Sequence, residues 1–149
     1  MLQFIPITPD HWEYLEPMMQ EFWAFERIPF ASDEALKVWQ KAWLHPELVR
    51  GWLLEFDTAT VGYAVLTFGF SLEYNGMDAY VDELFVKTEF RGQGFAARAL
   101  EFLESECREH NVNTLHLEVD ADNLAAKFLY AKVGFESSGR ELLSKSIRQ

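Results

Sequence analysis

The sequence predicts one α/β domain built on a mixed (α+β) sheet, with the element order β-α-α-β-β-β-α-β-α-β. Two observations indicate this class. The 149 residues are 49% hydrophobic and 15% aromatic, which suits one packed core in a chain too short for two. Apolar residues alternate in some segments and recur every three or four positions in others, as in strands and amphipathic helices. We expect a single domain over residues 1–149, with about six or seven strands and about four helices.

The N-terminal part is expected to form a strand and two helices. Residues 2–7 read as the strand, and Thr8-Pro9-Asp10 begins the first helix with a hydroxyl cap, a proline and an acid. Pro17 predicts a kink or a break in that helix. The second helix begins at Ser32-Asp33-Glu34 and ends before His45-Pro46. The residues expected to face inward are Trp12, Leu15, Met19, Phe22 and Phe25 in the first helix and Leu36, Trp39 and Trp43 in the second.

Three strands are expected next. Residues 52–56 and 61–70 are rich in aromatic and aliphatic side chains and flank a short polar turn, which predicts a β-hairpin. Asn75-Gly76 is a strong turn dipeptide, and residues 79–86 follow it as a further strand.

The remaining elements alternate between helix and strand. A glycine-containing loop leads into a helix with one apolar face that ends near Asn111, and Thr114–Val119 then alternates as a strand. Asp122 or Asn123 caps a shorter helix that Gly134 ends, and a last short strand is expected from Phe135 onward. The residues expected to pack inward are Ala96, Ala99, Leu100, Leu103 and Cys107 in the longer helix, and Leu124, Phe128 and Leu129 in the shorter one.

The charge and the cysteine count exclude several classes of protein. A net charge of -11 repels the phosphates of nucleic acid and of anionic lipid, so we expect neither partner. Cys107 is the one cysteine and lies on an apolar helix face, so it is read as a packing residue in a reducing compartment. The first residues resemble no signal peptide and no apolar run is long enough to span a bilayer, so a soluble cytoplasmic protein is expected. No metal site is expected, because the four histidines form neither an HxH nor an HExxH motif: His11, His45, His110 and His116.

The loop after the third strand of this group carries the clearest chemical signal. A strand ends at Val86, and a loop with Gly92 and Gly94 turns directly into a helix, so several backbone N–H groups can point at one anion. The GxxxxGK[ST] motif of a P-loop is missing. Gly92-x-Gly94-x-x-Ala97 fits the dinucleotide pattern and Glu118 lies downstream, but the strand does not run straight into the first glycine. We interpret the loop as a phosphate or pyrophosphate site of another kind.

The segment Arg91-Gly92-Gln93-Gly94-Phe95-Ala96 matches the acetyl-CoA signature [RQ]xxGx[GA] of the GNAT superfamily of N-acetyltransferases. Residues 81–86 resemble the strand that precedes this signature in the family. Asn123-x-x-Ala126-x-x-x-Tyr130-x-x-x-Gly134-Phe135 resembles its second signature. The resemblance covers residues 80–135 closely and the whole chain by element order, and it implies a GNAT-like fold.

The resemblance also implies a cosubstrate, acetyl-CoA, and the residues that hold it. Backbone groups of Phe85 and Val86 would pair with the pantetheine arm, and Asn123 would contact that arm. The N–H groups of the loop would hold the pyrophosphate: Arg91, Gly92, Gln93, Gly94, Phe95 and Ala96. A bulge in the strand at 80–86 would separate it from the strand at 114–119 and open a slot for the thioester.

The reaction needs a proton donor and a base. Tyr130 would stand beside the sulfur and protonate the leaving thiolate. An alkylammonium must lose a proton before it attacks, and Asp82 and Glu83 are the candidate carboxylates. Neighbouring residues of a regular strand face opposite ways, so only one would face the cleft unless the bulge alters this; Glu83 is slightly favoured.

The acceptor is expected to be a small cationic amine such as a polyamine. No basic residue lies between Arg50 and Lys87, and the layout of this stretch is similar to that of spermidine/spermine acetyltransferases. Its six acids are Glu55, Asp57, Glu73, Asp78, Asp82 and Glu83. The alternatives are a peptide or protein amine as acceptor, or a non-catalytic acyl-CoA-binding module. His116 and Glu118 share a strand face and are read as a solvated pair.

Few residues follow the second signature. After Gly134 the chain is shorter than the two-strand ending usual in the family. Either the last hairpin is abbreviated or a second subunit completes that side of the cleft, which would make a homodimer.

Overall fold

A computed structural model describes residues 1–148, which divide into two compact units, the first over Met1–Glu118 and the second from Val119 onward. The first unit holds one five-stranded sheet in the order β1-β2-β3-β4-β5. Its strands are β1 (Leu2–Pro6), β2 (Val49–Phe56), β3 (Ala59–Ser71), β4 (Gly76–Val86) and β5 (Thr114–His116). Neighbouring strands are antiparallel from β1 to β4, whereas β5 pairs with β4 in parallel. The predicted mixed α/β class is therefore confirmed.

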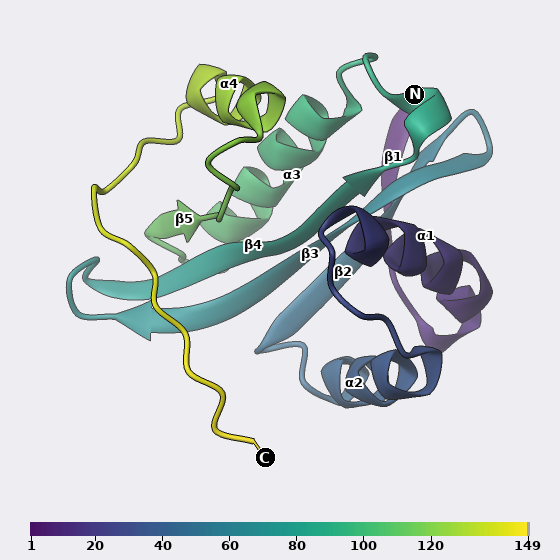
Figure 1. Ribbon diagram of the computed structural model, residues 1–149, viewed down its shortest axis with the longest axis horizontal. Helices are drawn as coiled ribbons and strands as arrows, with labels where there is room; N and C mark the ends of the chain where they lie inside the picture. The colour runs from purple at the N-terminus through teal and green to yellow at the C-terminus, as the bar shows by residue number, and fades with distance from the viewer. Residues whose placement is uncertain (149) are drawn as a thin grey trace. The chain divides into compact units, whose positions relative to one another are not determined.

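Helices cover both faces of this sheet (Figure 1). On one face lie α1 (Trp12–Phe25), which a short 3-10 helix η1 (Pro9–His11) precedes, and α2 (Ser32–Leu44). On the other face lies α3 (Phe95–Glu109), reached from β4 through a second 3-10 helix, η2 (Thr88–Phe90). The buried core is thus split by the sheet into two clusters.

Local signals in the sequence account for most element boundaries. Asn75 and Gly76 adopt the positive φ values, 64° and 141°, that the predicted turn between β3 and β4 requires. Asn111, which follows the His110 that caps α3, has a φ of 58°, the left-handed conformation that often ends a helix. The predicted bounds of α2 at Ser32 and before His45 are confirmed.

The expected break at Pro17 is wrong, because α1 runs as one helix from Trp12 to Phe25. A proline removes the hydrogen bond to the carbonyl four residues earlier, here that of Glu13. Glu13 and Pro17 both lie on the exposed side, where water satisfies the freed carbonyl. Phe25, a further candidate for the buried face, is 63% exposed.

The second unit contains one helix, α4 (Leu124–Lys132), within the described residues. Of the two caps that the sequence offered, Asp122 and Asn123, the Asn123 side chain caps it by accepting a hydrogen bond from the Ala126 N–H at 3.2 Å. The expected inward packing of Leu124 and Phe128 is wrong, since both side chains are mostly exposed. The α4 helix buries no side chain fully. Its start is therefore set by the Asn123 cap and not by a packed apolar face.

Two expectations about strands are corrected. The strand predicted at Thr114–Val119 ends at His116, because its register with β4 stops there. The strand expected from Phe135 onward does not form in the described residues, so the sheet has five strands instead of six or seven. A strand needs a partner, and the apolar side chains of this segment are exposed: Leu142, Leu143 and Ile147.

Candidate active site

A β-bulge in β4 determines which side chains reach the site. Val65 of β3 pairs with Glu83 and the next residue, Leu66, pairs with Val81, so Asp82 has no partner on β3. The extra residue reverses the alternation of side chains along the strand. Val81 and Leu84 consequently both pack on the α3 side, while Asp82 and Glu83 both line a cavity on the α1–α2 side.

This bulge settles one alternative that the sequence left open. In a regular strand one of the two acids would point away from the cavity. The structure brings both carboxylates to the same cavity, so neither Asp82 nor Glu83 is excluded as a site residue by its direction.

Two neutral donors hold the Glu83 carboxylate. The Tyr63 hydroxyl donates to Glu83 Oε1 at 2.6 Å, and the Trp23 indole N–H donates to Oε2 at 2.8 Å. Tyr63 is fully buried, so its ring is fixed between Phe22 and Phe85. Each carboxylate oxygen can accept a further hydrogen bond, which leaves Glu83 oriented but still able to take a proton.

Burial disfavours the charged forms of this network. It raises the pKa of Glu83, and the hydrogen bonds from Tyr63 and Trp23 oppose the increase. It raises the pKa of Tyr63 well above the ordinary phenol value, and the Glu83 carboxylate raises it further. The Tyr63 phenol therefore stays protonated and acts as a donor throughout the range in which Glu83 titrates.

Asp82 has a more open environment than Glu83. Its side chain is exposed at the cavity and makes no hydrogen bond or ion pair with another described residue. Desolvation by the surrounding protein still raises its pKa. Of the two adjacent carboxylates, Glu83 is thus held in place and Asp82 is left available to a ligand.

The cavity that these acids line has a volume of about 500 Å³. Its walls come from α1, the α1–α2 loop, α2, the loop after α2 and strands β2–β4. Most lining residues are apolar: Met19, Trp23, Pro29, Ala31, Ala35, Val38, Trp39, Ala42, Leu48, Val49 and Val65. The polar ones are Glu34, Lys41, His45, Thr67, Asp82 and Glu83.

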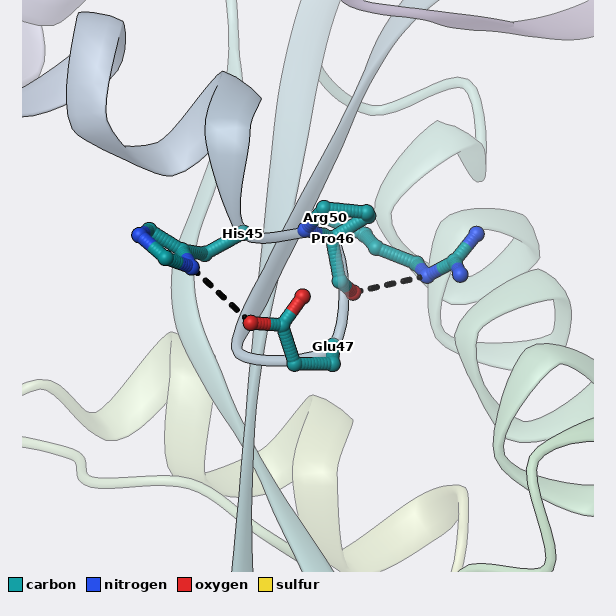
Figure 2. A network of polar contacts seen from close by, with 4 residues as sticks. All are labelled: His45, Pro46, Glu47 and Arg50. Atoms are coloured by element: carbon teal, nitrogen blue, oxygen red, sulfur yellow. Dashed lines mark hydrogen bonds and ion pairs between the residues drawn. The ribbon is translucent and has the colours of Figure 1, made fainter.

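The loop after α2 carries His45, one of the lining residues. Its Nδ1 lies 2.9 Å from Glu47 Oε1, and Arg50 on the other side of the loop donates from Nε to the Pro46 carbonyl at 3.1 Å (Figure 2). A backbone hydrogen bond at Glu47, followed by the bond with His45, lowers the pKa of that carboxyl. These contacts tie His45 and Arg50 to their own loop.

The sequence led us to expect that the six acids between Arg50 and Lys87 would lie together at the acceptor site. The structure does not bring them together at the cavity. Only Asp82 and Glu83 line it. Asp57 lies at a hairpin turn 3.4 Å from the N-terminal ammonium. Asp78 is buried and lies 3.1 Å from His116 Nε2, so the interpretation of His116 as solvated is also wrong.

The glycine-containing loop has the conformation that an anion site needs. Gly92 and Gly94 adopt φ values of 78° and 80°, and no atom lies within 4 Å of where a side chain would begin at either position. The α3 helix begins directly at Phe95 with no side-chain cap and no acid in its first turn. Its first N–H groups are therefore available to a ligand.

Arg91 and Phe95 have side-chain positions that the sequence did not indicate. Arg91 donates from Nε to the Val86 carbonyl at 2.9 Å, and its guanidinium lies 5.7 Å from the centre of the Phe85 ring. Its side chain is thus turned toward β4. Phe95, 3% exposed, packs against Phe56 with 5.0 Å between ring centres, so its size serves the core.

The edge of β4 beyond Tyr80 is open within the described part of the first unit. β5 pairs with β4 only over residues 78–80, so no strand hydrogen-bonds to that edge from Val81 to Val86. Phe85 and Val86 lie on this edge, and the glycine loop follows them.

Two further predicted site residues belong to the second unit. Asn123 Oδ1 caps α4, and the Tyr130 ring lies 6.0 Å from that of Phe135 in an edge-on arrangement. Their proposed contacts with acetyl-CoA stay predictions.

Sequence reasoning missed Trp23 and Tyr63 as site residues. Trp23 was given no role and Tyr63 was placed only within a predicted strand, and their polar atoms meet Glu83 only through tertiary contacts. The bulge had a visible signal, because Val81 and Leu84 are apolar, lie three apart and flank two acids.

The structure thus combines a bulged strand bearing carboxylates, an open strand edge and a glycine turn into an uncapped helix. The model of the acetyltransferase (GNAT) family matches residues 13–135. The chain belongs to this family. As a GNAT acetyltransferase it is an acyltransferase, and the resemblance found in its signatures is confirmed.

Solved structures share the fold of this acetyltransferase over nearly its whole length. An integron cassette protein from the mobile metagenome of Cole Harbour Salt Marsh is 33% identical, with a TM-score of 0.87, and the match covers 99% of this chain and 91% of that one. A predicted acetyltransferase of Clostridium acetobutylicum, solved with acetyl-CoA, is 18% identical with a TM-score of 0.80, and the match covers 97% and 96%.

A third structure is AAC(6')-Iy in complex with the bisubstrate analog CoA-S-monomethyl-acetylneamine, at 16% identity and a TM-score of 0.80, with 98% of each chain covered. The second and third structures are so low in sequence identity that their similarity to this chain shows a shared fold only. No match was found among curated protein sequences. No helix within residues 1–148 is long and apolar enough to cross a membrane.

Proposed function

We propose that this GNAT acetyltransferase transfers the acetyl group of acetyl-CoA to a small primary amine, with Glu83 as the base and Asp82 as the group that holds the amine. The observation that supports this most is the bulge, which directs both carboxylates into one cavity. An amine that is positively charged at neutral pH is attracted to such a pair.

The glycine loop and the β4 edge suit acetyl-CoA. The free N–H groups at the start of α3 and the two left-handed glycines offer an open cradle for a pyrophosphate. The unpaired edge at Phe85 and Val86 offers backbone groups to the amide-containing arm. The structures of a Clostridium acetobutylicum relative with acetyl-CoA and of AAC(6')-Iy with a CoA-linked analog support the same cosubstrate.

Each of the proposed side chains has a separate role in the reaction. Acetyl-CoA supplies the acetyl group as a thioester. Asp82 holds the incoming ammonium, and Glu83, oriented by Tyr63 and Trp23, first takes one proton from it, so that the neutral amine can attack the thioester carbonyl. A backbone N–H near Phe85 or Val86 stabilises the oxyanion. The C–N bond forms, the C–S bond breaks, and Tyr130 gives its proton to the leaving thiolate. The nitrogen then loses its second proton, which restores the Tyr130 phenol and leaves a neutral amide.

The raised pKa of Glu83 fits the role of a base. A carboxylate with an ordinary pKa of about 4 is a weak base, and a higher value improves the driving force for accepting a proton. Tyr63 and Trp23 hold the carboxylate in place, so less freedom is lost when the amine arrives.

Fewer acidic residues support a cationic acceptor than the sequence suggested. Two of the six acids line the cavity, so the Asp82–Glu83 pair supports a cationic amine, and the acidic run as a whole no longer does. A polyamine is one such amine. A lysine peptide is the alternative acceptor to compare with it.

Calorimetric titration with acetyl-CoA and an assay for released CoA thiol test this function. We expect binding at micromolar acetyl-CoA, and thiol release that depends on both an added small amine and Glu83. The panel comprises spermidine, a simple alkylamine and a short lysine peptide. No binding below roughly millimolar acetyl-CoA would overturn the proposal. Faster turnover of the lysine peptide than of the small amines would show that the acceptor is a peptide amine instead of a small amine.

A further inference from the structure

The cavity beside Asp82 and Glu83 is apolar over most of its wall and acidic at one end. Eleven of its lining residues carry apolar side chains, and α2 contributes several of them from one face. We infer that the acceptor is a primary monoamine on an uncharged, apolar body, bound with its nitrogen at the two acids. This inference rests on the proposed function and specifies its substrate.

Two tryptophans give this wall a fixed shape before any ligand binds. The Trp23 N–H is held by Glu83, and its ring packs edge-on against Phe30 with 5.5 Å between ring centres. The Trp39 N–H lies 3.1 Å from the Met19 sulfur, and its ring packs against Trp43 at 5.8 Å. Because both indole N–H groups have partners inside the protein, these rings present apolar surface to the cavity.

Apolar side chains at the cavity are also exposed to water. Val38 is 64% exposed and Leu48 is 52% exposed, although both line the cavity. A ligand body that covers them removes apolar surface from water, which stabilises the complex by roughly 25 cal/mol per Å². A hydrated, charged body gains nothing from the same contact.

The charged or titratable groups that line the cavity besides Asp82 and Glu83 are Glu34, Lys41 and His45. Glu34 is paired with Lys37 at 3.5 Å, and His45 is paired with Glu47. Lys41 adds a positive charge on the α2 side of the wall. A second ammonium on the acceptor would therefore meet apolar surface, Lys41 or the Glu34–Lys37 ion pair instead of an unpaired carboxylate.

Hexylamine and 1,6-diaminohexane form a matched pair for testing this, since they differ in one terminal ammonium. We expect kcat/KM for hexylamine to exceed that for the diamine at least tenfold. From propylamine to hexylamine, kcat/KM should rise about fourfold per added methylene, as burial of each CH₂ predicts. Binding in the presence of CoA, followed by tryptophan fluorescence, should give the same order without any turnover.

A substitution in the cavity wall distinguishes the effect of its charge on acceptor preference from the effect of its shape. Val38→Asp adds a carboxylate to the exposed side of the wall without emptying the core, and it should lower the preference for hexylamine over the diamine at least fivefold. Gln40→Asp is the matched control, because Gln40 is exposed on the same helix and does not line the cavity. Its preference should stay within twofold of that of the wild type.

The outcomes distinguish this inference from the proposed function. If the diamine or spermidine is bound and acetylated faster than hexylamine, the inference is wrong and the acetyl-transfer function stands. If hexylamine binds in the stated order but no amine is acetylated, the function is wrong and the character of the cavity is confirmed. If no amine binds, or if chain length has no effect, the inference is overturned.

Discussion

Tyr63 and Glu83 are joined across neighbouring strands by a hydrogen bond of 2.6 Å, with the phenol fully buried and the carboxylate at the edge of a cavity. The register shift between β3 and β4 places Glu83 opposite Val65 and on the same side of the sheet as Tyr63. A core residue thereby orients a carboxylate that we assign to proton transfer.

Tyr63→Phe should shift the acid limb of the pH profile of kcat/KM to higher pH. The hydrogen bond from Tyr63 lowers the pKa of Glu83, so its removal raises that pKa, and activity is lost at a higher pH as the medium is acidified. The ring volume is kept, and the loss of one buried hydrogen bond should cost about 1 kcal/mol of stability. Tyr14→Phe, at an exposed position, is the control. An unchanged acid limb in Tyr63→Phe would separate Tyr63 from the chemistry.

Gly62→Ala should both destabilise the protein and weaken acetyl-CoA binding. A Cβ at Gly62 would lie 2.1 Å from the Phe85 carbonyl oxygen, so the backbone of β4 at the proposed cofactor edge must move. We expect a loss of about 1–3 kcal/mol in the free energy of unfolding, measured by denaturant titration. Gly69→Ala, in the same strand, meets only the Asp78 side chain at 2.9 Å and should cost less. Equal effects of Gly62→Ala and Gly69→Ala on stability and on acetyl-CoA binding would contradict this prediction.

Gly94→Val should raise the dissociation constant of acetyl-CoA about tenfold. Gly94 has a φ of 80°, a conformation that costs other residues about 1–2 kcal/mol, so a β-branched side chain will turn the first N–H groups of α3 away from the anion. Gly139→Val is the control, because Gly139 has a φ of 77°, also has nothing within 4 Å, and lies outside the loop. Titration calorimetry measures both. The loop assignment fails if the two variants bind acetyl-CoA as tightly as the wild type.

Tyr130→Phe should lower kcat while the affinity for acetyl-CoA changes little, because the phenol proton is needed only when the thiolate leaves. A slower leaving step predicts that an acetyl donor with a more acidic thiol is less affected by the substitution. Steady-state kinetics with the two donors measure this. Wild-type turnover in Tyr130→Phe would remove the residue from the mechanism.

The order of elements up to α4 was predictable because its signals are local. A cap at Asn123, a turn at Asn75-Gly76 and a glycine before α3 each act within a few residues of the position they determine. The last strand was not predictable, because a strand exists only if another segment pairs with it.

The site was predictable in its acids and its loop, and not in its supporting groups. The RGQGFA segment and the adjacent Asp82 and Glu83 were proposed from residue types together with the resemblance to the GNAT signature. That Trp23 and Tyr63 hold Glu83 depends on tertiary packing between α1, β3 and β4, for which the sequence has no short-range signature. The apolar wall of the cavity was hidden for the same reason, since its tryptophans looked like ordinary core residues.

The central claim is that Glu83 accepts the proton of the amine. It is tested most directly by the pH dependence of kcat/KM for Glu83→Gln and Asp82→Asn measured beside the wild type. We predict that Glu83→Gln lowers kcat/KM at least a hundredfold and abolishes the acid limb, while Asp82→Asn raises the KM for the amine and keeps that limb. A wild-type profile in Glu83→Gln, together with loss of the acid limb in Asp82→Asn, would contradict the claim and make Asp82 the base.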